Sequence, residues 1–121
     1  MDKMADAIVE RILYGADTKT IFAGARTFHN TGVTLTRKES GYVRSKLSYR
    51  VYASKMQIEL DVIVWQMPDG SFCPQYASLG EQGHEEKVWR VSQEASGLFA
   101  LQEIPRRVLR MEEGLGLEPP L

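Results

Sequence analysis

Apolar and polar residues alternate along a central stretch of the chain, residues 42–65. A period of two is typical of strands that bury one face. A hairpin that turns at Ala53 and Ser54 brings the apolar residues of both halves onto one face. The inward pairs of this register are Val51 with Met56, Tyr49 with Ile58, Leu47 with Leu60, Ser45 with Val62 and Val43 with Val64. The outward face then mixes charged and aromatic residues.

The same period continues upstream, in segments 21–29 and 33–38. Residues 30–32, Asn-Thr-Gly, suit a three-residue hairpin loop with the glycine in the left-handed region, and residues 39–41 have the same form. The resulting register places Val33 opposite Leu47, Leu35 opposite Ser45 and Thr27 opposite Leu35, with Arg26 and Phe28 on the outer face.

A strong turn signal, Pro68-Asp69-Gly70, follows the central hairpin. It predicts a short strand over residues 71–76, which Pro74 limits to a sheet edge or an early end. Residues 77–83 are expected to form a loop. Together these segments predict an antiparallel meander of about five strands.

Helices are expected before and after the meander along the chain. The apolar spacing within residues 4–13 predicts an amphipathic helix. Residues 84–95 fit either a helix or a strand, and we favour the helix, whose apolar face continues to Ile104. Pro105 then begins a last helix that runs to about Glu113.

These elements predict an α+β fold in which the helices cover the inner sheet face. Residues 1–114 form one domain, and residues 115–121 form a C-terminal tail containing two prolines.

Composition narrows the function classes. A net charge of −1 over 121 residues disfavours a general nucleic-acid binder, which usually carries a basic excess. The single cysteine excludes an internal disulfide and fits a reducing compartment. Apolar runs are too short to span a bilayer, so we expect a cytoplasmic protein with no membrane partner.

The outer face of the meander is the strongest candidate for a binding surface. Cations between aromatic rings can hold an anionic group while a ring stacks on a base. The candidate ligand-binding residues are Arg26, Phe28, Tyr42, Arg44, Lys46 and Trp65, joined by Arg106, Arg107 and Arg110. These last three arginines form either a solvated helix face, which we favour, or an anion clamp that closes over the sheet. A simpler alternative is that the protein's own helices or a second subunit cover these rings.

Catalytic and metal chemistry have weaker support. Glu59 and Asp61 lie two residues apart on one strand, but Asp61 is expected to pair with Lys46. His29, His84 and Cys73 lack metal-ligand spacing, so neither a metal nor a cofactor is expected.

No sequence motif assigns a family. The leading hypothesis is a non-enzymatic protein, working as a homo-oligomer and specifically a dimer, that binds an anionic, nucleotide-like small molecule on this face. The alternative is a small inhibitor or adaptor that binds another protein, of the kind that mobile elements encode. A single-stranded nucleic-acid binder is the third reading.

Overall fold

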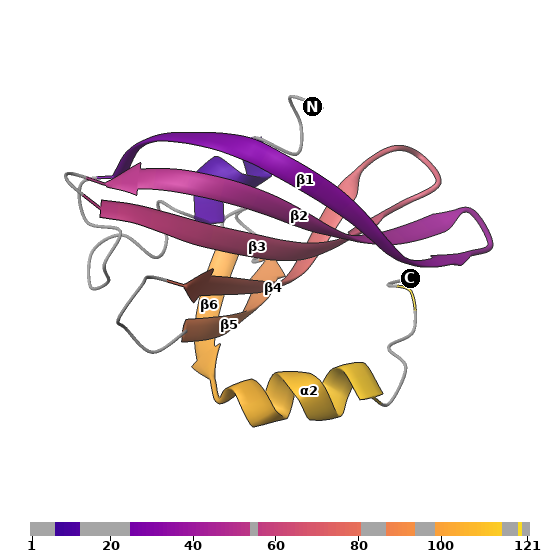
Figure 1. The fold of residues 1–121 in the computed structure, drawn as a ribbon. Helices are drawn as coiled ribbons and strands as arrows, with labels where there is room; N and C mark the ends of the chain where they lie inside the picture. The colour runs from indigo at the N-terminus through magenta and orange to yellow at the C-terminus, as the bar shows by residue number, and fades with distance from the viewer. Residues whose placement is uncertain are drawn as a thin grey trace.

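A six-stranded antiparallel sheet forms the body of the protein, with its strands in the order β1-β2-β3-β4-β5-β6 (Figure 1). This computed structural model describes residues 7–12, 25–53, 56–80, 87–93, 99–114 and 119. The strands are β1 (Ala25–Glu39), β2 (Tyr42–Ala53), β3 (Met56–Gln66), β4 (Phe72–Gly80), β5 (Lys87–Gln93) and β6 (Phe99–Ile104). Residues 7–12 are helical, and helix α2 (Arg106–Gly114) follows β6. The antiparallel α+β class is confirmed, but the sheet has six strands where about five were predicted.

In the central hairpin the side chains lie on their predicted faces, but different residues lie opposite one another. Val51 lies opposite Ile58 and Leu47 opposite Val62, a shift of two residues from the prediction. A shift of two preserves which side chains share a face, because side chains alternate with a period of two. The predicted inner face therefore holds the core, which includes Leu47, Tyr49, Val51, Ile58, Leu60, Val62 and Val64.

Strand β1 is continuous where a loop was predicted at residues 30–32. The chain passes through this segment with a bulge in its pairing to β2, between Asn30 and Gly32. The extra residue reverses the sides of the upstream part, so Phe28 lies opposite Val51 and packs on the inner core. Placing Phe28 on the outer face was wrong for this reason. Thr27 lies opposite Tyr52, not opposite Leu35.

The turn between β1 and β2 is also shorter than predicted. Glu39 pairs with Tyr42, so only Ser40 and Gly41 form the turn, and both have positive φ. A second bulge, between Leu35 and Arg37, compensates for the shorter turn. The predicted pairs Val33 with Leu47 and Leu35 with Ser45 are therefore confirmed.

The C-terminal half is strand-rich, which corrects three predictions. Residues 77–80 continue β4, where a loop was predicted, and the segments 87–93 and 99–104 are strands rather than helical segments. The rest of the predicted loop and helix, residues 81–86 and 94–95, lies outside the described residues. Both faces of β5 are covered: Trp89 and Val91 belong to the inner core, and Val88 packs in a second cluster on the outer face. Burial on both faces removes the simple alternation and imitates helical spacing.

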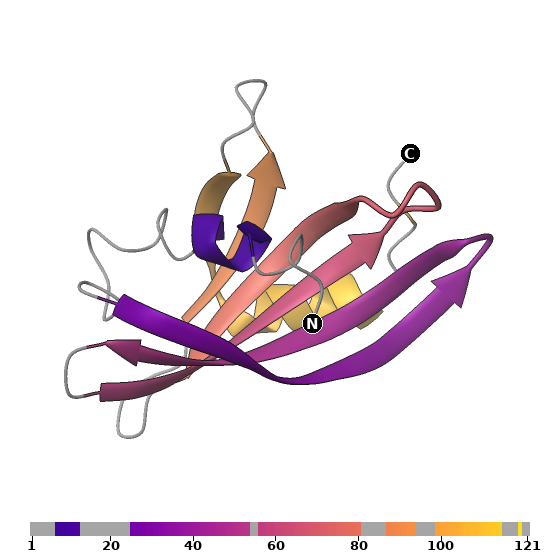
Figure 2. The same ribbon diagram turned by 90° about the horizontal axis from the view of Figure 1, so that it is seen from above.

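Helical segments cover both faces of the sheet, as Figures 1 and 2 show from two directions. Ile8, Val9 and Ile12 pack on the inner core, which confirms the predicted N-terminal helix over residues 7–12; residues 4–6 and 13 lie outside the described residues. Helix α2 follows Pro105 as predicted, but its Leu109 packs on the outer face. The prediction that the helices cover only the inner face of the sheet was therefore wrong. No described helix is long and apolar enough to cross a membrane.

Candidate functional site

Three of the predicted binding residues come together on the outer face of β2 and β3. Arg44 lies directly opposite Trp65, and the Tyr42 ring meets Trp65 edge-on with the ring centroids 6.4 Å apart. Arg44 is only 8% exposed, however, and Trp65 is 0% exposed. The cation and the indole belong to a covered layer, not to an open surface.

Contacts to β4 and α2 hold the Arg44 guanidinium in this layer. Its Nε donates a hydrogen bond of 3.2 Å to Oε1 of Gln75, and its Nη2 lies 3.8 Å from a carboxylate oxygen of Glu113. Burial lowers the pKa of Arg44, and the nearby Glu113 carboxylate opposes that shift. Within the described part of the chain, Arg44 Nη2 and Trp65 Nε1 have no hydrogen-bond acceptor.

Helix α2 is fixed to the outer face by a polar cluster beside Arg44. The Tyr76 hydroxyl donates a hydrogen bond to Glu112, and Arg90 forms an ion pair with the same carboxylate. Burial and the hydrogen bond to Glu112 raise the pKa of Tyr76 to about 12. The hydrogen bond from Tyr76, supported by Arg90, lowers the pKa of Glu112. These contacts keep α2 over the sheet.

The other predicted binding residues are dispersed. Lys46 lies on the outer face opposite Ile63. Phe28 contacts Tyr49 on the inner face, with the ring centroids 5.8 Å apart. Arg106, Arg107 and Arg110 are exposed on α2, whereas Leu109 of the same helix faces the sheet. The Arg26 side chain lies outside the described structure.

The cross-strand pair expected for Asp61 is also different. Asp61 lies opposite Ser48, because the hairpin register is shifted by two residues. The predicted pairing with Lys46 was therefore wrong.

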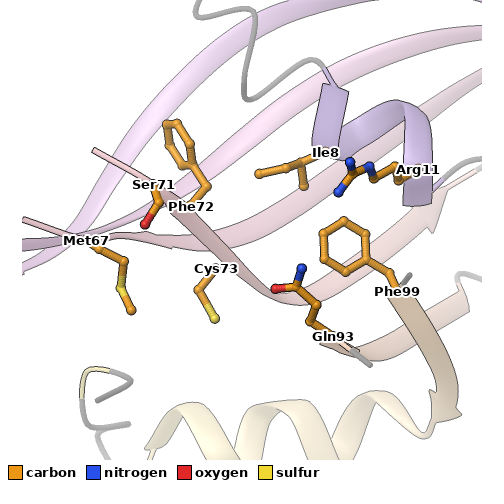
Figure 3. Close-up of a pocket in the computed structure, with 8 residues that line it drawn as sticks. All are labelled: Ile8, Arg11, Met67, Ser71, Phe72, Cys73, Gln93 and Phe99. Carbon is orange, nitrogen blue, oxygen red and sulfur yellow. The ribbon is translucent and has the colours of Figure 1, made fainter. Parts of the chain in front are cut away.

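A pocket of about 380 Å³ lies where β4 and β5 separate. The pairing of β4 with β5 extends only from Leu79 to Tyr76, so the beginning of β4 and the end of β5 diverge. Pro74 lies where β4 pairs with Val64 of β3 but not with β5, so its missing N–H removes no ladder bond to β5. The residues that line the pocket are Ile8, Arg11, Met67, Ser71, Phe72, Cys73, Gln93 and Phe99 (Figure 3).

Arg11 supplies the positive charge in this pocket. Its guanidinium carbon lies 5.8 Å from the centroid of the Phe99 ring, within the range of a cation–π contact. Figure 3 shows the guanidinium reaching from the helix over Phe99, with the Gln93 carboxamide beside the same ring. No carboxylate of the described residues forms an ion pair with Arg11. Among the described residues, therefore, no carboxylate neutralises this guanidinium, whose N–H groups are hydrogen-bond donors.

Most of the remaining pocket wall is apolar. Ile8 and Phe72 line it from the helix and from β4, and Met67 and Cys73 contribute sulfur atoms. Figure 3 shows that Phe72 and Cys73 leave β4 on opposite sides, so the pocket wall includes both sides of this strand. Burial raises the pKa of the Cys73 thiol, so the neutral form predominates near neutral pH. Cys73 therefore presents a neutral, polarisable thiol to the pocket.

Arg11, Gln93 and Phe99 line the pocket but were not among the predicted binding residues. Ile8 and Arg11 are three residues apart, a spacing that places them on one side of a helix, and this was the available signal. Phe99 could not be located from the sequence, because the apolar spacing on either side of it predicts helical segments. Its position depends on the pairing of Phe99 with Gln93 across β5 and β6.

Comparison with known proteins adds no assignment: no family model, curated protein or solved structure matches this chain. Within the described ranges, no group of three or more His, Cys, Asp or Glu side chains could hold a metal ion.

Proposed function

We propose that this protein binds a small anionic molecule with a flat apolar ring, a class that includes nucleotides, in the pocket between the N-terminal helix and the ends of β4, β5 and β6. One observation carries the proposal: Arg11, with no carboxylate partner among the described residues, lies over Phe99 at a pocket of about 380 Å³. This volume is at the small end of the range for small-molecule sites.

The chemistry of the walls favours one orientation of such a ligand. A ring between Phe72 and Phe99 would replace water on apolar surfaces. The anionic group would then meet Arg11, and Gln93 can donate or accept a further hydrogen bond. One cation and mostly apolar walls suit a ligand with one charged end rather than a highly charged polymer.

The pocket is a better candidate than the outer face. A ligand at Arg44 and Trp65 would have to displace Glu113 and the contacts that hold α2. The pocket requires no such displacement. Its lining offers a neutral thiol but no activated nucleophile, so we propose that binding itself is the activity. A cytoplasmic location remains part of this proposal, on the basis of the single cysteine.

Thermal stabilisation by a ligand panel tests the proposal. The panel contains mononucleotides, cyclic nucleotides and aromatic carboxylates, and it is applied to the wild type and to three variants. Arg11→Gln removes the pocket cation, Arg44→Met removes the outer-face cation, and Lys38→Gln is a charge-matched control at an exposed β1 position. A ligand that binds the folded state raises the melting temperature by mass action.

We expect stabilisation of the wild type, Arg44→Met and Lys38→Gln, and its loss in Arg11→Gln. Loss in Arg44→Met with retention in Arg11→Gln would instead move the site to the outer face. If no compound stabilises the wild type, the proposal is wrong, and a protein-binding inhibitor or adaptor becomes the leading reading.

A further inference from the structure

Strand β1 forms a free edge of the sheet. It is 15 residues long and, among the described residues, pairs only with β2. One row of its backbone N–H and C=O groups is therefore available to another strand. An exposed edge of this length is a template for pairing with a second chain.

Two apolar side chains mark the middle of this edge. Val33 is 55% exposed and Leu35 is 61% exposed. They lie opposite Leu47 and Ser45, so they belong to the inner face of the sheet. The β1–β2 hairpin extends beyond the helix of residues 7–12, as Figure 2 shows, so the helix does not cover its far end.

We propose that two copies of this chain pair antiparallel along β1, about a two-fold axis at Thr34, to form one continuous sheet. In this register Val33 of each copy meets Leu35 of the other. The pairs farther out are Gly32 with Thr36, Thr31 with Arg37, Asn30 with Lys38 and His29 with Glu39. Apolar residues meet apolar residues, and no like charges lie opposite one another.

Neighbouring registers lose this match. An axis at Val33 sets Leu35 against Thr31, and an axis at Leu35 sets Val33 against Arg37. A register offset by half a step places Val33 opposite Thr34 and reverses the match of faces. Of these registers, only the one with the two-fold axis at Thr34 places both apolar residues of each copy opposite apolar residues of the other.

Bulges on either side of the apolar pair confine the regular pairing to the segment around Thr34. The β1–β2 pairing is irregular between Asn30 and Gly32 and again between Leu35 and Arg37. Bulges twist a strand and discourage long edge-to-edge pairing. The contact uses the same β1 edge of both copies, so it closes as a two-fold dimer and does not propagate. The pocket is lined by residues of β4, β5 and β6, whereas the proposed contact uses β1 at the other end of the strand order. This inference therefore does not depend on the proposed function.

Disulfide cross-linking tests the axis directly, because a cysteine on a two-fold axis faces itself. Thr34→Cys is made in a Cys73→Ser background, with Gln102→Cys on β6, the other sheet edge, as the exposed control. Under mild oxidation we expect Thr34→Cys to form covalent dimers at least about tenfold faster than Gln102→Cys, because the dimer raises the effective thiol concentration. Equal rates would overturn the proposed register.

Sedimentation over a concentration series tests the dimer without cysteine changes. The wild type is expected to sediment as a dimer that dissociates on dilution, whereas Leu35→Glu is expected to be monomeric. Met111→Glu, at an equally exposed apolar residue on α2, is expected to remain dimeric. A monomeric wild type, or a Leu35→Glu variant that dimerises like the wild type, would overturn the proposal.

Discussion

Trp65 lies directly opposite Arg44 across β2 and β3, and both side chains are buried under the outer-face layer. Arg44 Nε is hydrogen-bonded to Gln75, while Arg44 Nη2 and Trp65 Nε1 find no acceptor among the described residues. The aliphatic part of Arg44 therefore contributes packing, and part of its polar surface is left unsatisfied.

This arrangement predicts that Arg44 contributes to stability mainly through its shape. Arg44→Met keeps the length of the side chain and removes the unsatisfied donor, so we expect the free energy of unfolding to change by less than about 1 kcal/mol. Arg44→Ala leaves a cavity beside Trp65 and should cost about 2–3 kcal/mol. Urea unfolding of both variants measures the difference. Equal losses in both would mean that the charge, not the packing, is what matters.

The hydrogen bond between Tyr76 and Glu112 predicts a stability difference that depends on pH. The pKa of Glu112 is lowered from 4.5, so its contribution is present above pH 4.5 and is lost as the pH falls through the folded-state value. The pKa of Tyr76 is raised from 10.0 to about 12, so its contribution is complete below pH 10 and is lost as the pH rises toward 12.

Tyr76→Phe should therefore cost about 1–2 kcal/mol between these limits, and this cost should shrink at both ends. Urea unfolding from pH 4 to 11 provides the measurement. Tyr52→Phe, at an exposed tyrosine, is the control and should change stability little at any pH. A cost of Tyr76→Phe that does not vary with pH would contradict the role of this hydrogen bond.

Two turn glycines should be intolerant of alanine, unlike Gly32. Gly41 and Gly70 have φ values of 86° and 89°, which alanine adopts at a cost of about 1–2 kcal/mol each. An added Cβ at Gly41 would make an ordinary van der Waals contact with Pro68, 3.4 Å away, so the backbone conformation sets the cost. Gly32, where the sequence suggested a left-handed turn, has no positive φ and nothing within 4 Å of an added Cβ. Melting temperatures should fall for Gly41→Ala and Gly70→Ala and stay nearly constant for Gly32→Ala.

Face assignment could be predicted from the sequence where one sheet face is buried continuously. Tyr49 and Ile58 belong to the inner core even though the register differed by two residues, because an even shift leaves every side chain on its side. Phe28 changed sides, because a single bulged residue reverses the alternation and leaves no clear mark in the sequence.

The pocket could not be predicted in the same way. Its walls come from four separate elements, and two of these, the ends of β5 and β6, resembled helices because both faces of β5 are buried. The sequence placed Arg44 correctly on the outer face. It could not show that the Arg44 side chain is buried there, because this burial depends on the packing of α2.

Alkylation of Cys73 tests the central claim most directly, because it is the only cysteine in the chain and lines the pocket. The rate of its reaction with iodoacetamide is measured by intact-mass spectrometry, with and without a compound that raises the melting temperature of the wild type. The proposed site predicts that the compound slows alkylation in the wild type and has no effect on the rate in Arg11→Gln. A compound that stabilises the wild type while leaving the alkylation rate of Cys73 unchanged would contradict binding in this pocket.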